Sequence, residues 1–138
     1  MRIMAIDYGD AHTGIAISDP TGLLAGFTTV INSRRQEVVV EQVTLLAKEH
    51  GAEELVLGHP VNMDGTLGPR SEKAKAMKVL LEEATALPVV LWDERRTTID
   101  AHNILFNSGK NAKQWKKVVD AVAASLILEG YLTFKKSH

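Results

Sequence analysis

The sequence predicts an α/β protein built on a mixed five-stranded sheet with helices on both faces. Two observations predict this class. Three strand-like segments follow one another closely at the N-terminus, and two short apolar strands then alternate with helical patterns. The length of 138 residues fits one domain, so residues 1–138 are predicted to form a single unit.

The first three strands are predicted at Arg2–Asp7, Thr13–Asp19 and Leu23–Ile31. Their apolar and β-branched residues favour strands, and Pro20–Gly22 favours a turn between the second and the third. Turns this short join neighbouring antiparallel strands. The N-terminal part of the chain is therefore predicted to be an antiparallel meander.

The middle of the chain alternates helices and strands. The segment Ser33–Gln36 has the pattern of a capping box that begins a helix, and Gly51 is expected to end it. Pro69 fits the first position of a second helix. Buried parallel strands are predicted at Glu54–Gly58 and Pro88–Trp92. The predicted apolar faces of the two helices contain Val39, Val43, Leu46 and Ala47, and Ala74, Met77, Leu80, Leu81 and Ala84.

The last part of the chain is predicted to be a helical hairpin that covers one end of the sheet. A short helix follows Thr97 and is broken at Asn107–Gly109, and a long helix runs from about Ala112 to Tyr131. The predicted buried side of the long helix contains Val118, Val119, Val122, Leu126 and Ile127. Ligands of open α/β sheets bind at the carboxyl ends of strands, so functional residues are expected there.

The composition excludes several classes of protein. The chain has no cysteine, which excludes disulfides and thiolate metal sites. No segment approaches the ~18–20 apolar residues of a membrane span, and the sequence begins in a strand pattern instead of a signal peptide, so a cytoplasmic protein is expected. The net charge is −1, yet residues 95–138 contain 8 Lys and Arg against 3 Asp and Glu. This basic segment could bind phosphates or could be a solvated helix face.

Asp7 is the first candidate functional residue, because it ends an apolar strand. An ionised carboxylate in apolar surroundings is costly unless it is paired or binds a metal. Gly9 and Gly14 lie nearby and would let a phosphate or a polynucleotide backbone approach closely. The structural alternative is that Asp7 caps the turn Asp10–Thr13 or pairs with Arg95.

The segment Trp92–Thr98 is the second candidate region. Asp93 and Glu94 leave the end of an apolar strand, and two carboxylates in this place are a reasonable set of metal ligands. Arg95 or the arginine after it could bind a phosphate with two parallel hydrogen bonds. The alternative is an ordinary polar loop that leads into a helix capped by a threonine.

Asp120 interrupts the apolar helical run Val118–Leu128. Aspartate is unfavourable inside helices and is rarely buried without a partner, which favours a functional role. The alternative is an ion pair with Lys116, although lysine before aspartate at this spacing is the weaker orientation. Lys113, Lys116 and Lys117 fall along the same helix side as Asp120, where they could bind a polynucleotide backbone.

The three acids Asp7, Glu94 and Asp120 are more informative together than separately. Carboxylates that converge without cysteine and without histidine-rich spacing favour hard cations, Mg²⁺ or Mn²⁺. Two such ions, about 3.5–4 Å apart, can activate water and stabilise the leaving oxygen of a phosphodiester. The sequence thus predicts a metal-dependent phosphodiester hydrolase with these three acids as catalytic residues and metal ligands.

A further loop, Leu57–Pro69, runs from a strand end to a helix start. Asn62, Asp64 and Thr66 are predicted to contact the substrate there, although Asp64 followed by glycine is also a common turn dipeptide. Of the histidines, His59 beside the strand end is the best candidate for function.

Four segments resemble, in order and spacing, the YqgF (RuvX-like) family of bacterial proteins. They read IDYGDAHTGIAISD, GHPVNMDGTLGP, DERRTT and VVDAVAASLILEGYL, and they cover nearly the whole chain. The resemblance implies an RNase H-like fold and a nuclease that matures the 5′ end of pre-16S ribosomal RNA. It also implies that Asp7, Glu94 and Asp120 are the catalytic acids. Holliday junction resolution is the other activity that the resemblance implies.

The chain departs from the pattern of this family at two histidines. His12 replaces a usual arginine, which removes a permanent charge from a predicted substrate contact, and His59 replaces a usual leucine. Many RNase H-like nucleases also have their second carboxylate just after the strand that corresponds to Glu54–Gly58. In this chain the acid follows the next strand instead.

Other functions are compatible with the same residues. A resolvase of DNA four-way junctions should be a symmetric dimer, and the sequence does not indicate an oligomeric state. Asp-x-Gly before a hairpin also begins the phosphate-binding half of actin-like and sugar-kinase ATPases, which need two such domains. A third alternative is a non-catalytic module that binds RNA or the ribosome.

Overall fold

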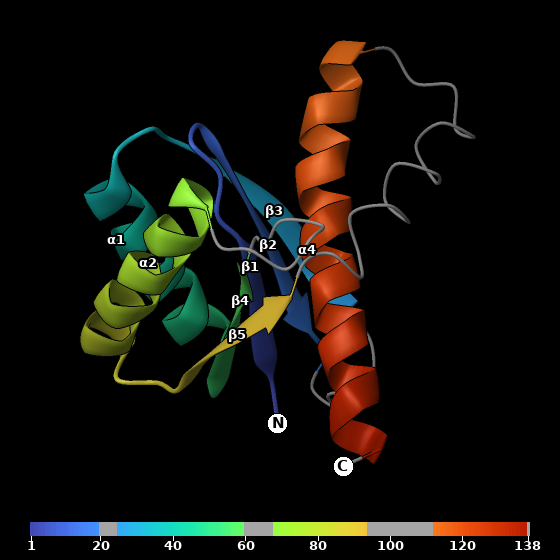
Figure 1. Ribbon diagram of the computed structural model, residues 1–138. Helices are drawn as coiled ribbons and strands as arrows, with labels where there is room; N and C mark the ends of the chain where they lie inside the picture. Colours follow the sequence, from blue (N-terminus) through green and yellow to red (C-terminus); the bar gives the residue numbers. More distant parts are fainter. Residues whose placement is uncertain (20–24, 60–67, 94–111, 138) are drawn as a thin grey trace.

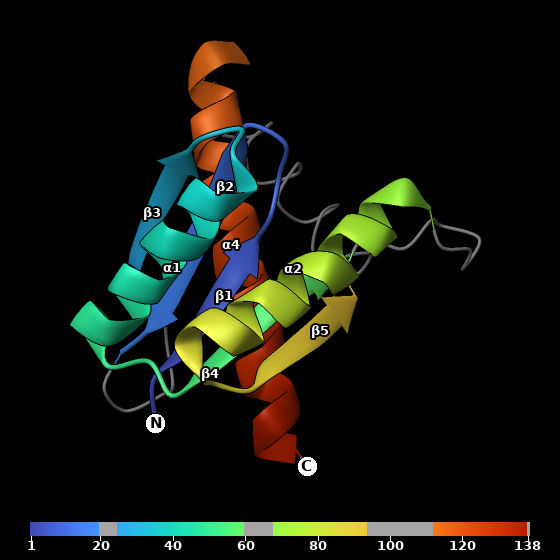
Figure 2. The same cartoon turned by 90° about the vertical axis from the view of Figure 1, so that its left-hand side faces the viewer.

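The computed structural model describes residues 1–19, 25–59, 68–93 and 112–137, and for residues 112–121 we describe the course of the backbone. In chain order the elements are β1 (Ile3–Asp7), β2 (His12–Ser18), β3 (Ala25–Asn32), α1 (Gln36–His50), β4 (Glu54–His59), α2 (Pro69–Thr85), β5 (Val89–Asp93) and α4 (Ala112–Ser137). They form three layers. Helices α1 and α2 lie side by side on one face of the sheet, and α4 crosses the other face (Figures 1 and 2).

The sheet has five strands in the order β3-β2-β1-β4-β5. Strands β1, β2 and β3 are antiparallel neighbours, whereas β4 pairs in parallel with both β1 and β5. The predicted mixed five-stranded sheet is therefore confirmed, with each strand within two residues of its expected bounds. Because β1, β4 and β5 run in the same direction, their carboxyl ends meet at one edge of the sheet, at the top in Figure 2. We call this the carboxyl edge, and the opposite one the amino edge.

Two hydrophobic clusters hold the three layers together. Alternate residues of β1 point to opposite faces of the sheet, so Met4 and Ile6 pack under α1 and α2, whereas Ile3 and Ala5 pack against α4. Both faces of the central strands are thus covered, which explains why those strands read as continuous apolar runs. Each fully buried aliphatic side chain contributes about 1.5–3 kcal/mol.

Helix α1 begins two residues later than a capping box at Ser33 requires. Its N-cap is Arg35, which makes no side-chain capping bond. The Ser33 hydroxyl instead accepts a hydrogen bond from the Arg35 backbone N–H at 3.1 Å, while the Ser33 N–H donates to the carbonyl of Ala11 at 3.0 Å. The predicted capping box is therefore wrong, because Ser33 is held beside the β1–β2 turn. The expected end at Gly51 is confirmed, with φ at 69°.

Helix α2 begins at Pro69 as predicted, but its buried face differs from the expected one. Leu80 is half-buried and Ala84 is exposed. The face that packs on the sheet consists of Ser71, Ala74, Met77 and Leu81. Ser71 in the first turn is buried although it is polar, so apolar spacing alone did not indicate that it belongs to this face.

Helix α4 continues to Ser137, about one and a half turns past its predicted end at Tyr131. Val122 and Leu126 are half-buried, whereas Ile127 is buried as predicted. The buried face of the second half of α4 consists of Ala123, Ala124, Ile127, Leu128, Tyr131 and Leu132. The predicted short helix after Thr97 lies outside the described residues. No helix in the described ranges is both long and apolar enough to span a membrane.

Candidate functional site

The carboxyl edge brings together three polar residues that end three parallel strands: Asp7 of β1, His59 of β4 and Asp93 of β5. His59 and Asp93 are direct partners in the β4–β5 register, and Asp7 lies opposite Gly14 of β2. The strand pairing thus places these three polar residues at the edge where functional residues are expected, and their role stays a prediction. The register also determines the face of the sheet to which each residue belongs.

Asp7 belongs to the face that α4 covers, because it alternates with Ile3 and Ala5. Its side chain is half-buried. Within the described part of the chain, no hydrogen bond or ion pair involves its carboxylate, so Asp7 does not cap the β1–β2 turn. Partial burial of a carboxylate without a partner is energetically unfavourable. Carboxylates in this situation are typical of ligand-binding sites.

His59 and Asp93 belong to the opposite face. Their strand neighbours Leu57 and Leu91 pack in the cluster under α1 and α2. The Nε2 atom of His59 lies 2.5 Å from the hydroxyl of Ser71, a fully buried residue in the first turn of α2. This hydrogen bond fixes the end of β4 to α2. His59 therefore has a structural role as the partner of Ser71. The sequence analysis did not identify Ser71 as this partner.

Gly9 and His12 flank the turn that follows Asp7. A Cβ atom at Gly9 would lie 2.4 Å from the carbonyl oxygen of His12, so the turn itself requires a glycine. The Nδ1 atom of His12 donates to the side-chain oxygen of Asn32 at 2.7 Å across the β2–β3 pair. Both residues thus have a role within the fold, and their predicted contact with substrate stays a prediction.

The other predicted site residues cannot be compared with the structure in the same way. Glu94, Arg95, Asn62, Asp64 and Thr66 lie outside the described residues. Asp120, Lys116 and Lys117 lie on the first half of α4, where only the backbone is described. Among the described residues, no group of three or more His, Asp or Glu side chains is arranged to hold a metal ion. A metal site of three acids therefore stays a prediction.

Sequence reasoning missed a charged cluster beside the β1–β2 turn. Lys73 of α2 lies 3.2 Å from a carboxylate oxygen of Asp10. The hydrogen bond from Lys73 and its positive charge hold the pKa of the Asp10 carboxyl below its ordinary value, and the charges of Arg70 and Arg34 lower it further. The only sequence signal was the presence of Arg70, Lys73 and Lys75 in the first two turns of a predicted helix.

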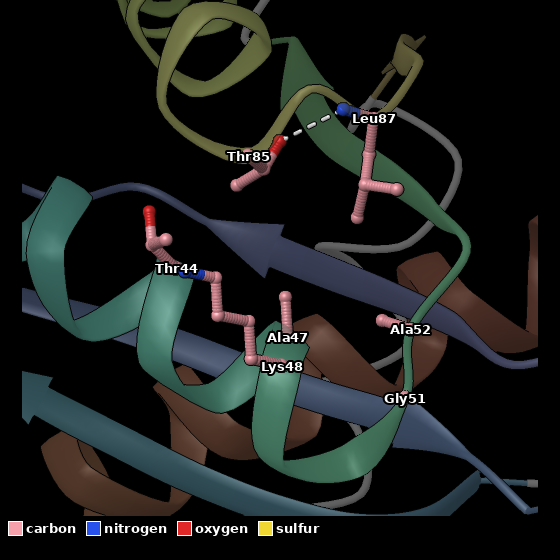
Figure 3. A pocket seen from close by; sticks show the side chains of 7 residues that line it. All are labelled: Thr44, Ala47, Lys48, Gly51, Ala52, Thr85 and Leu87. Carbon is pink, nitrogen blue, oxygen red and sulfur yellow. Dashed lines mark hydrogen bonds between the residues drawn. The ribbon is translucent and has the colours of Figure 1, made fainter.

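A hollow lies between the C-terminal ends of α1 and α2 (Figure 3). Its volume is about 200 Å³. Its lining is mostly apolar and consists of Thr44, Ala47, Lys48, Gly51, Ala52, Thr85 and Leu87. Because it opens at the amino edge and contains no acid or histidine, it offers no group for hydrolytic chemistry.

The sheet order and the helix on each face are those of RNase H-like proteins, and the fold matches solved nucleases of this class. RuvC of Thermus thermophilus, solved in complex with a Holliday junction substrate, aligns with a TM-score of 0.66 at 14% identity, over 99% of this chain and 96% of that one. The resolvase of Fowlpox virus aligns with a TM-score of 0.61 at 12% identity, over 98% and 99%. A ROK hexokinase from Thermus thermophilus aligns with a TM-score of 0.52, over 75% of this chain and 38% of that chain.

Sequence comparison is more specific than the fold. The profile of the family described as "RuvX: Holliday junction resolvase" matches residues 1–134. Proteins from Halothermothrix orenii and from Listeria monocytogenes serotype 4b are 42% and 43% identical to this chain. The alignments cover 98% and 96% of this chain, and 96% and 97% of those proteins, each of which is named "Putative pre-16S rRNA nuclease". The chain belongs to the RuvX family, as the sequence motifs predicted.

Proposed function

We propose that this chain is a metal-dependent nuclease that hydrolyses phosphodiester bonds during 5′-end maturation of pre-16S ribosomal RNA. The observation that carries the proposal is Asp7, a half-buried carboxylate without a partner in the described residues, at a strand end of an RNase H-like sheet. The names of the two relatives, each a pre-16S rRNA nuclease, support this choice of substrate. Residues 1–138 act as one nuclease domain in this proposal, and a cytoplasmic location follows from the substrate.

Asp7, Glu94 and Asp120 are the proposed catalytic residues and the proposed ligands of Mg²⁺ or Mn²⁺. Asp7 fits this role, because hard cations prefer carboxylate oxygens and its carboxylate has no competing partner among the described residues. When bound, such ions would lower the pKa of a water molecule and neutralise charge on the phosphodiester. The protein contributes by holding its acids at the sheet edge and by orienting the scissile bond beside them.

The position of α4 supports Asp120 as a partner of Asp7. The Tyr131 hydroxyl donates a hydrogen bond to Glu54 at the start of β4, which fixes α4 against the sheet. Residue 120 precedes Tyr131 by eleven residues, or three turns, and so lies on the same side of the helix, about 16 Å toward the carboxyl edge. Asp7 lies four residues along the sheet from the level of Glu54, or about 13 Å. The two estimates agree to within one helical turn.

Strand alternation supports Glu94 over Asp93 as the second acid. Asp93 belongs to the face under α2, opposite to Asp7. The residue after it would belong to the face of Asp7 if the strand direction continued. We therefore retain Glu94 in the proposed site and exclude Asp93.

Several of the proposed substrate contacts lie close to one of these acids in the sequence. The partner is structured precursor ribosomal RNA, whose phosphates need cations and hydrogen-bond donors beside the scissile bond. The proposed contact residues are Gly9, His12, Asn62, Asp64, Thr66, Arg95, Lys116 and Lys117. His12, the first residue of β2, is held by a hydrogen bond to Asn32 of β3. The His12 ring is therefore already oriented beside the turn that follows Asp7.

Holliday junction resolution is the second candidate function, because the family description names it and two of the structural neighbours were solved in complex with a Holliday junction substrate. Such an enzyme cuts two strands and needs two symmetric active sites. A kinase-like function is less favoured. The hexokinase alignment covers 75% of this chain but only 38% of that chain, so the likeness extends to one part of such an enzyme.

The test is a cleavage assay with Mg²⁺ or Mn²⁺ and two probes, precursor rRNA with an unprocessed 5′ end and a DNA four-way junction. We expect the parent chain to cut the precursor RNA near the mature 5′ end, and Asp7→Asn to abolish cutting while circular dichroism stays unchanged. Asp93→Asn is the matched control, because it removes an aspartate at the same edge on the opposite face. Its activity should be retained.

Three results would overturn the proposal in different ways. Cutting of the junction alone would favour the resolvase function. Equal activity of Asp7→Asn and the parent would remove Asp7 from the catalytic site. RNA binding without any cutting would favour a non-catalytic module. Thermal unfolding gives an independent readout, since Mn²⁺ should raise the Tm of the parent and not that of Asp7→Asn.

A further inference from the structure

The charged cluster beside the β1–β2 turn has no evident structural purpose. Asp10 and Lys73 form an ion pair at 3.2 Å, but their side chains are 74% and 59% exposed. Exposed pairs of this kind contribute little to stability, because water and salt screen them. The pair therefore needs another explanation than holding α2 to the turn.

Positive charge exceeds negative charge in this cluster. The charges of Lys73, Arg70 and Arg34 all act on the single acid Asp10. Arg34 is brought there by the hydrogen bond from the backbone N–H of the preceding residue, Ser33, to the carbonyl oxygen of Ala11. The three cations come from the start of α2 and from the segment before α1, so only the tertiary structure assembles them.

The acids in the first turns of α1 and α2, which the structure describes, do not neutralise this excess. Glu37 in the first turn of α1 binds Arg35 at 2.9 Å, and Glu72 in the first turn of α2 lies 3.7 Å from Lys75. Each of these acids thus has a cation of its own outside the cluster. The excess arises although residues 1–94 together contain 8 Lys and Arg against 14 Asp and Glu.

Two of the three cations, Arg70 and Lys73, line a small hollow on the α2 side of the carboxyl edge. Its lining consists of Tyr8, Asp10, Arg70, Lys73 and Ala74. We call it the Asp10 hollow. Tyr8 follows Asp7 in the chain and packs against the cluster under α1 and α2, so it belongs to the other face of the sheet. A strand of RNA that crosses the carboxyl edge beside Asp7 would reach the Asp10 hollow next.

We propose that Arg34, Arg70 and Lys73 around the Asp10 hollow bind a backbone phosphate of the RNA substrate on the α2 side of the carboxyl edge. The inference rests on the proposed nuclease function and extends it. The lysines of α4 would contact the strand on one face of the sheet, and the Asp10 hollow on the other. Asp10 orients Lys73 through their ion pair. A bound phosphate would replace the Asp10 carboxylate as the partner of Lys73.

The proposal predicts opposite effects for two changes within one ion pair. Replacing Lys73 and Arg70 together by glutamine should weaken RNA binding about tenfold and reduce the slope of log K against log salt by roughly one to two. Asp10→Asn should strengthen binding, because it removes the one negative charge. If the ion pair were purely structural, the variants on its cationic and on its acidic side would change RNA binding in the same direction.

The experiment measures binding of the full chain to a precursor rRNA stem between about 50 and 200 mM salt, the range over which phosphate contacts dominate affinity. EDTA is present so that no cleavage occurs, which separates the result from catalysis. Lys78→Gln is the matched control, because Lys78 lies on the same helix and binds Glu82 at 3.1 Å, away from the hollow. Its affinity and salt slope should equal those of the parent.

Unchanged affinity and slope in the Arg70→Gln, Lys73→Gln double variant would overturn the proposal, as would weaker binding by Asp10→Asn or no RNA binding by the parent. Inorganic phosphate at millimolar concentration should compete poorly, and strong competition would assign the hollow to free phosphate. If the double variant binds normally while Asp7-dependent cleavage is intact, the nuclease function stands and the hollow proposal fails. If binding depends on the hollow and no RNA is cut, the hollow proposal stands and the nuclease function fails.

Discussion

The two edges of the sheet differ in how their polar groups are paired. At the amino edge, Arg2 donates to the carbonyl oxygen of His50 at 2.6 Å, and the Ser18 hydroxyl accepts from the backbone N–H of Ile3 at 2.8 Å. Glu54 there accepts a hydrogen bond from Tyr131 and is also bound by a lysine of α4. At the carboxyl edge, Asp7 has no such partner among the described residues.

This difference separates structural acids from candidate functional ones. Glu54 and Asp7 are both acids at an end of a central strand, and both are at least partly shielded from water. Glu54 is neutralised within the fold and fixes α4 to the sheet. Partial burial of the Asp7 carboxylate is unfavourable, and no partner in the described structure compensates for it. Such an acid is expected where a ligand supplies the compensation. The predictions below test this contrast.

The largest effect is expected at Asp120, the proposed partner of Asp7 at the carboxyl edge. Asp120→Ala should abolish nuclease activity and leave the free energy of unfolding unchanged or higher in metal-free buffer, because alanine is the better helix former. Mg²⁺ should stabilise the parent and not the variant. A loss of several kcal/mol in stability without metal would instead indicate a buried ion pair, as at the amino edge.

Glu54→Gln should show the reverse behaviour. It removes the charge that binds Tyr131 and Lys135, so we expect the free energy of unfolding to fall by about 1–3 kcal/mol. Cleavage per folded molecule should be unchanged, because Glu54 lies at the amino edge. Chemical denaturation and a cleavage assay on the same preparations measure both quantities. A large loss of activity in the folded variant would mean that the two edges are not separate.

The alkaline limit of stability should depend on Tyr131. Burial raises the pKa of its hydroxyl above the ordinary value of 10.0, and the hydrogen bond to Glu54 raises it further. The folded state therefore keeps this proton more strongly than the unfolded chain does. The resulting stability is present below about pH 10 and is lost as the pH rises above it.

The variant Tyr131→Phe checks this expectation. It should be less stable than the parent at neutral pH by about 1–2 kcal/mol, since it leaves Glu54 with one hydrogen bond fewer. Its stability should fall less steeply than that of the parent between pH 10 and pH 11. Parallel pH profiles for the two proteins would mean that the hydroxyl has no part in fixing α4.

The smallest effects are expected at two helix ends of the amino edge, Gly51 and Ala86. Both adopt the left-handed conformation, with φ at 69° and 58°. This conformation is unfavourable for alanine, so Ala86→Gly should stabilise the protein by up to ~1 kcal/mol. Gly51→Ala should destabilise it by about 1 kcal/mol, although nothing lies within 4 Å of the added Cβ atom. Equal and opposite shifts in Tm would confirm that backbone conformation alone matters there.

Much of the fold could be predicted from the sequence, because its signals are local. Strand periodicity, the glycine that ends α1 and the proline that begins α2 each act within a few residues. The failures came from tertiary contacts. Ser33 has the sequence of a cap but donates its N–H to Ala11 in another part of the chain, and the packing of α2 on the sheet buries Ser71 and leaves Leu80 half-buried.

The sequence by itself determined the succession of strands and helices along the chain and the presence of an acid at the end of β1, because each depends on residues close together in the chain. It also determined the family, because four short motifs occur in order along the chain. The tertiary structure alone decided which face each polar residue occupies, and therefore that Asp93 and His59 lie on the side opposite to Asp7. It also decided the pairing of Glu54 with Tyr131, 77 residues apart, and of Asp10 with Lys73, 63 residues apart. Such contacts depend on how the strands pair and how the helices pack, and no spacing within a short segment encodes them.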